Sequence, residues 1–110
     1  MAIFTNIVKQ TDLPIKFELN QNNPNPFKGK TIIRYSVAYK TKVIIMINDV
    51  QGQVIHKIVS QNQEAGTYEI EFYADGLPTG NYFYHIITDD FFKSREMELI
   101  KWIYQPTTQQ

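Results

Sequence analysis

The sequence predicts an all-β domain, an antiparallel, immunoglobulin-like β-sandwich of about seven strands. Three observations lead to this prediction. Apolar residues alternate with polar ones in several short segments, which is the period of a half-buried strand. Turn signals rich in Gly, Pro, Asn and Asp separate these segments at sandwich-like spacing. Aromatic residues make up 14% of the chain and mix with β-branched residues, a composition that favours strands.

Length and composition indicate one domain. The chain has 110 residues, an apolar fraction of 43% and no cysteine. This length allows a core to form without disulfide or metal staples. We divide the sequence into a lead-in or docking segment at residues 1–14, the sandwich at residues 15–101 and a flexible C-terminal tail at residues 102–110.

Residues 1–14 precede the regular alternation. Ile3, Phe4 and Ile7 fall at helical spacing, but the stretch is too short to be a stable helix alone. Two readings stay open for this segment. It is an extra edge strand or frayed lead-in, or it is a docking segment that orders on a partner.

The first predicted strand covers residues 15–20, where Ile15, Phe17 and Leu19 alternate with polar residues. Two prolines exclude helix and central strand from residues 21–27, so we expect an ordered or extended loop there. Phe27 should plug one end of the core. Residues 31–37 alternate again and form the next predicted strand.

A hairpin lies at the centre of the sequence. Residues 43–48 and 53–59 are its predicted strands, and residues 49–52 are its turn. Asp49 opens this turn and Gly52 closes it, which is the signature of a type I turn whose glycine has a positive φ.

The second half of the chain repeats the strand pattern. We predict a polar loop at residues 60–66 and three further strands, at residues 67–73, 81–88 and 91–101. Five of their residues should lie in the core: Tyr68, Ile70, Phe72, Tyr82 and Tyr84.

The residues do not indicate an enzyme, a metal site or a cofactor. His56 and His85 lie on different predicted strands, and neither has a carboxylate or a hydroxyl nucleophile at motif spacing. The five glycines are scattered through turns, whereas a phosphate-binding loop needs a glycine-rich run that opens a helix. Asp89 and Asp90 are adjacent, so on a strand they would point to opposite faces.

Charge and hydropathy exclude two further classes. The formal net charge is zero, and the basic residues form no cluster interleaved with aromatics, so we predict no nucleic-acid binding. No apolar run approaches the roughly 20 residues that a membrane-spanning helix needs, so we predict no transmembrane segment.

The sequence has more apolar residues than one sandwich core accommodates. Alternation places Ile44 and Met46 opposite the core-facing residues of their strand, and it does the same for Phe83 and Ile87. If these positions are contiguous with the apolar termini, they form a surface for a protein partner. The predicted partner-binding residues are Ile3, Phe4, Ile7, Ile44, Met46, Phe83, Ile87, Trp102 and Tyr104. The competing reading is that the terminal segments fold back and bury the strand residues within the monomer.

A set of motifs carries a resemblance to a known family. The motifs are Leu19-Asn20-Gln21-Asn22-Asn23-Pro24-Asn25-Pro26-Phe27, Thr31-Ile32-Ile33-Arg34-Tyr35, Asp49-Val50-Gln51-Gly52, Ala65-Gly66-Thr67-Tyr68 and Leu77-Pro78-Thr79-Gly80-Asn81-Tyr82-Phe83-Tyr84. The sequence at residues 17–101 resembles the type A C-terminal sorting domain of the type IX, or Por, secretion system of Bacteroidota. That domain is similar to the immunoglobulin-like domain of the flagellar hook-capping protein.

The resemblance implies that the domain ends a secreted protein and is recognised by the outer-membrane translocation machinery. It also implies recognition through the last strands, at residues 80–84 and 97–101, and a location at the cell surface or outer membrane. A second reading applies if Met1 is the natural start. The chain would then stay in the cytoplasm, or bound to a complex, as an accessory or scaffold subunit that keeps the fold without the sorting role. Either role requires a protein partner, the secretion translocon or a larger complex.

Overall fold

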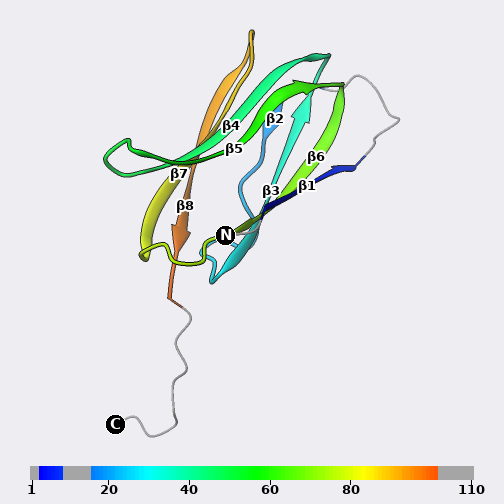
Figure 1. Ribbon diagram of the computed structural model, residues 1–110. Helices are drawn as coiled ribbons and strands as arrows, with labels where there is room; N and C mark the ends of the chain where they lie inside the picture. Colours follow the sequence, from blue (N-terminus) through cyan, green and yellow to red (C-terminus); the bar gives the residue numbers. More distant parts are fainter. Residues whose placement is uncertain (1–2, 9–15, 102–110) are drawn as a thin grey trace, which may run out of the picture.

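Two four-stranded antiparallel sheets pack face to face in the computed structural model (Figure 1). The structure describes the backbone of residues 3–8 and both backbone and side chains of residues 16–101. Its strands are β1 (Ile3–Val8), β2 (Glu18–Leu19), β3 (Lys30–Val37), β4 (Thr41–Asp49), β5 (Val54–Gln63), β6 (Gly66–Tyr73), β7 (Gly80–Ile87) and β8 (Phe92–Leu99). The prediction of an all-β sandwich is confirmed.

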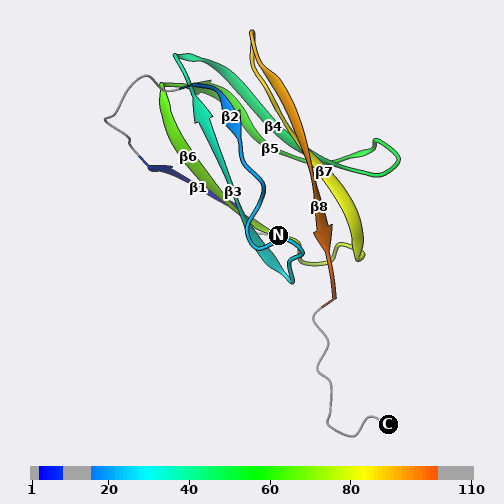
Figure 2. The same cartoon turned by 180° about the vertical axis from the view of Figure 1, so that it is seen from behind.

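The strands divide between the sheets in the orders β1-β6-β3-β2 and β5-β4-β7-β8. The chain crosses from the first sheet to the second between β3 and β4, returns between β5 and β6, and crosses again between β6 and β7 (Figures 1 and 2). No helix that could cross a membrane occurs in the part of the chain that the structure describes.

The core forms between the two sheets because alternate residues of every long strand point inward. Ile33 and Tyr35 of β3 contribute fully buried side chains from one sheet, and Ile45 and Tyr84 contribute them from the other. The five predicted core residues are buried, with exposed fractions of 0–5%, so that prediction is confirmed: Tyr68, Ile70, Phe72, Tyr82 and Tyr84. Phe27 is also buried, as predicted.

The central hairpin has the predicted turn. The Gly52 N–H donates to the Asp49 carbonyl at 3.0 Å, and the Asp49 N–H donates to the Gln53 carbonyl at 3.0 Å. The Asp49 carboxylate accepts the N–H groups of Gln51 and Gln53, each at 2.9 Å. Gly52 has a φ of 86°, in the left-handed region that rejoins the two strands.

Replacing Gly52 with valine should destabilise the domain by about 1 kcal/mol or more, because a β-branched residue is strained at positive φ. A Cβ at this position would meet no atom within 4 Å, so the cost comes from the backbone and not from a clash. Thermal unfolding measures the effect. A melting temperature equal to that of the unchanged protein would contradict the turn assignment.

Two predicted boundaries are wrong. The strand predicted at residues 15–20 is reduced to Glu18–Leu19, because the chain beyond Leu19 leaves the ladder and binds side chains of the other sheet. Phe17 is half-buried and stacks on Phe91, with 5.4 Å between ring centroids. Ile15 lies outside the described residues.

The loop predicted at residues 60–66 is also wrong, because β5 continues to Gln63 beside β4. The strand is an edge strand, so its last residues are mostly polar and exposed and look like a loop in the sequence. The buried Gln63 is an exception, and its side-chain carbonyl accepts the Tyr35 hydroxyl at 2.8 Å. Breaks in register opposite Ile45/Met46 and Ile47/Asn48 mark bulges along β5.

The backbone of β1 pairs with β6 at the edge of the first sheet. Of the alternatives predicted for the N-terminal segment, residues 3–8 therefore form the extra edge strand. Ile3 lies opposite Phe72 in register, and Ile7 lies opposite Tyr68. The backbone of β1 therefore does not cover β4 and β7, which belong to the other sheet (Figure 1).

Candidate functional site

The Asn- and Pro-rich loop at residues 20–27, here called the strap, joins the two sheets at one open edge of the sandwich. Asn23 forms an isolated antiparallel bridge with Ile32 of β3. Phe27 forms a parallel bridge with Leu99 of β8, in the other sheet. The strap therefore pairs with an edge region of each sheet.

Asn22 holds the strap in shape from within. Its side chain is 3% exposed, and its Nδ2 donates to the Pro24 carbonyl at 3.1 Å and to Thr31 Oγ1 at 3.0 Å. The Thr31 hydroxyl donates in turn to the same Pro24 carbonyl, at 2.7 Å. These contacts satisfy polar groups that would be costly to bury alone.

Tyr84 of β7 links the strap to the core of the second sheet. Its hydroxyl donates to the Asn20 carbonyl at 2.6 Å and accepts the Asn22 N–H at 2.7 Å. Burial of the ring raises the pKa of Tyr84 to about 12, so the hydroxyl keeps its proton at neutral pH. One hydroxyl group thus satisfies two main-chain groups of the strap.

The strap holds the main chain of the last strand. The Glu98 N–H donates to Asn25 Oδ1, and its carbonyl accepts the Phe27 N–H, each at 2.9 Å. The Ile100 N–H donates to the Phe27 carbonyl at 2.9 Å. The C-terminal half of β8 is therefore paired with β7 on one side and with the strap on the other.

Two tyrosines near the starts of β6 and β7 donate hydrogen bonds from their hydroxyl groups to carbonyls four residues earlier in the chain. The Tyr68 hydroxyl donates to the Glu64 carbonyl, and the Tyr82 hydroxyl donates to the Pro78 carbonyl, each at 2.6 Å. This is the geometry of a tyrosine corner, which fixes the entry of a strand into a sandwich. Gly80 has a φ of 142°, a backbone conformation that favours glycine and directs the chain into β7.

Four of the predicted partner-binding residues lie together on the outer face of sheet β5-β4-β7-β8. Ile44, Met46, Phe83 and Ile87 are half-buried, whereas their neighbours Ile45, Tyr84 and Ile86 are fully buried. Ile44 lies opposite Ile87 across the β4–β7 pair.

Phe92 of β8 extends this outer face and was missed from the sequence. It lies opposite Ile87 and is 62% exposed. Alternation along the last predicted strand is the signal that could have found it, because it directs Met97 and Leu99 inward and Phe92 outward. We call Ile44, Met46, Phe83, Ile87 and Phe92 the apolar face.

The predicted partner-binding residues of the N-terminal segment belong to a different sheet from the apolar face. Ile3, Phe4 and Ile7 belong to β1, at the edge of the opposite sheet. Trp102 and Tyr104 lie outside the described residues. The N-terminal residues therefore lie on a different sheet from the apolar face, and partner binding by these nine residues stays a prediction.

His85 lies in the middle of the apolar face, where its ring contacts two polar side chains. Its Nδ1 contacts Ser94 Oγ at 2.6 Å, its Nε2 contacts Asn48 Oδ1, and its ring stacks on Phe92 with 5.9 Å between centroids. Burial lowers the pKa of His85, which favours the neutral ring. Among residues 16–101, no group of three or more His, Cys, Asp or Glu side chains could hold a metal ion.

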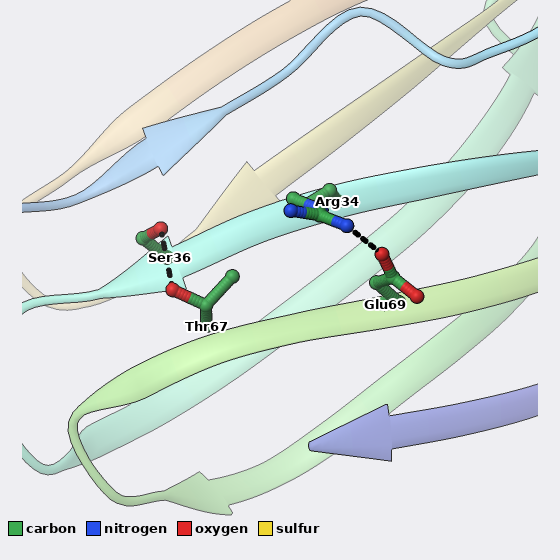
Figure 3. A network of polar contacts seen from close by, with 4 residues as sticks. All are labelled: Arg34, Ser36, Thr67 and Glu69. Carbon is green, nitrogen blue, oxygen red and sulfur yellow. Dashed lines mark hydrogen bonds and ion pairs between the residues drawn. The ribbon is translucent and has the colours of Figure 1, made fainter. Parts of the chain in front are cut away.

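The outer face of the opposite sheet is polar where β3 and β6 meet. Arg34 forms an ion pair with Glu69, and Ser36 Oγ lies 3.4 Å from Thr67 Oγ1 (Figure 3). Cross-strand polar pairs of this kind stabilise an antiparallel sheet; the Arg34–Glu69 pair is partly exposed, and the Ser36–Thr67 contact is buried. The two outer faces of the sandwich therefore differ in chemistry.

In a comparison with known protein families, residues 23–100 match the family described as "Secretion system C-terminal sorting domain". Comparisons with curated proteins and with solved structures gave no significant match. The matched range begins within the strap and ends just after β8, so it contains both tyrosine corners and all three of the crossings described above. No enzyme family is indicated, and a sorting domain is a non-catalytic signal. The chain belongs to the family of type IX secretion C-terminal sorting domains.

Proposed function

We propose that the secretion machinery binds this domain through the apolar face and thereby selects the protein that carries it for export and attachment to the cell surface. The observation that carries the proposal is the row formed by Ile44, Ile87 and Phe92, which lie side by side on β4, β7 and β8. Adjacent apolar side chains on three strands form a patch, and such patches mark sites of association.

The contrast between the two sheets supports this choice of surface. The opposite sheet carries polar pairs on its outer face, a partly exposed ion pair and a buried hydroxyl contact (Figure 3). The apolar face instead leaves Phe92 mostly exposed and four other apolar side chains partly so. Of the segments that the family resemblance implicates in recognition, residues 80–84 and 97–101, the first supplies Phe83 to this face.

Replacing Ile44 with lysine should reduce binding to the purified translocon at least about tenfold, because a charge within an apolar contact must be desolvated. The matched control is Ile32→Lys. Ile32 is also half-buried and lies on the outer face of β3, opposite Glu71. Affinity measured with the detergent-solubilised translocon should fall for Ile44→Lys and stay near the original value for Ile32→Lys.

Equal binding by both variants, with both folded, would show that the apolar face is not the contact surface. A folded chain that fails to bind the translocon but co-purifies with a stable intracellular complex would instead favour the accessory or scaffold subunit.

A further inference from the structure

The outer edge of β8 is divided into a paired half and an open half. In the C-terminal half, Glu98 and Ile100 bond to the strap, and the Glu96 carbonyl accepts Gln21 Nε2 at 2.7 Å. Because hydrogen-bonding direction alternates along a strand, Phe92 and Ser94 direct their N–H and carbonyl groups to this same edge. Within residues 16–101, no hydrogen bond reaches these main-chain groups.

A cleft lies beside the open half. It has a volume of about 300 Å³ and lies between the chain around β2 and the inner side of β8. Its walls include Lys16, Phe17, Phe91, Lys93 and Arg95. The cleft forms because β2 has only two residues, so the first sheet does not cover this end of the second one. Figure 2 shows β8 at the free edge of its sheet, with β2 in the other sheet.

The charge of the cleft is mainly positive. Lys16 and Lys93 are exposed, and Arg95 uses its Nε to donate to the Leu19 carbonyl at 2.8 Å. Glu18 is the acidic residue of the lining, and no ion pair joins it to these three cations within the described part of the chain. The stacked rings of Phe17 and Phe91 add an apolar surface.

From these features we propose that an extended, acidic segment of a protein partner adds to β8 as a further strand. Its main chain pairs with Phe92 and Ser94, and its alternate side chains enter the cleft, where carboxylates meet Lys16, Lys93 and Arg95. This contact is distinct from the apolar face, because it uses the edge of the sheet and the side chains on its inner side. The β5 edge is less suited to strand addition, since its bulges interrupt the ladder.

The test uses the full chain and a synthetic peptide of alternating valine and glutamate, with a valine–lysine peptide of the same length as the charge control. Nuclear magnetic resonance should show that the acidic peptide shifts the amide signals of Phe92 and Ser94 and slows their hydrogen exchange. The basic peptide should leave them unchanged. Shifts of equal size with both peptides, or shifts confined to other strands, would overturn the proposal.

Two further comparisons separate strand pairing from simple charge attraction. Lys93→Glu should weaken binding of the acidic peptide about tenfold, because attraction becomes repulsion, whereas Lys57→Glu on β5 should leave it unchanged. Both lysines are exposed, so neither change should unfold the domain. In an added strand, every second amide of the peptide faces β8 and the amides between them face away. N-methylation of the amides that face β8 should abolish binding of the acidic peptide, and N-methylation of the others should not affect it. Equal affinity for both methylated peptides, or equal loss with both lysine variants, would contradict strand addition.

Discussion

Truncating Phe72 to alanine should destabilise the domain by about 3–5 kcal/mol, since it removes a large ring from a closely packed interior. Phe72 is fully buried on β6 and lies edge-to-face against Phe27, with 6.3 Å between ring centroids. The change therefore affects both the middle of one sheet and the anchor of the strap. Equilibrium unfolding in urea measures the loss.

Phe92→Ala is the matched control, because it makes the same chemical change at a ring that is 62% exposed. We expect its free energy of unfolding to stay within about 0.5 kcal/mol of the original. A Phe72→Ala protein that is as stable as Phe92→Ala would contradict the assignment of Phe72 to the core.

Replacing Tyr84 with phenylalanine should cost about 1–3 kcal/mol, because the Asn20 carbonyl and the Asn22 N–H each lose a buried partner. The ring stays, so the core keeps its packing and the effect is specific to the strap. Hydrogen exchange of the Glu98 and Ile100 amides should also accelerate, because the strap accepts both N–H groups.

The control for this change is Tyr39→Phe, which removes the hydroxyl of a tyrosine that is 48% exposed and bonded to Asp90. Its free energy of unfolding should change by less than about 0.5 kcal/mol. If Tyr84→Phe keeps full stability and the exchange rates at Glu98 and Ile100 are unchanged, Tyr84 does not hold the strap.

The strands and the central turn could be predicted because their signals are local. Alternation in β4 and β6 reflects burial on one face, and Asp49 and Gly52 form their turn through contacts within five residues. The same alternation identified Ile44 and Ile87 as outward residues. It could not show that they are adjacent, because the pairing of β4 with β7 joins segments about forty residues apart in the sequence.

The strap could not be predicted for a related reason. Its prolines indicated a loop, but its course depends on Tyr84 and Glu98, which lie more than sixty residues further along the chain. The end of β5 was missed because an exposed edge strand carries the polar residues that are also typical of loops. Phe17 left the predicted strand because it packs with Phe91 and Tyr39 in an aromatic cluster.

We propose that this folded domain is a sorting signal and that the secretion machinery reads it through its apolar face. The proposal is tested by the amount of an exported fluorescent reporter that reaches the surface of a type IX-secreting bacterium when the chain is fused to the reporter's C-terminus. We expect surface fluorescence with the unchanged chain and with Ile32→Lys, and its loss with Ile44→Lys, at equal levels of folded protein. Equal surface fluorescence with Ile44→Lys, or none with the unchanged chain, would contradict the proposal.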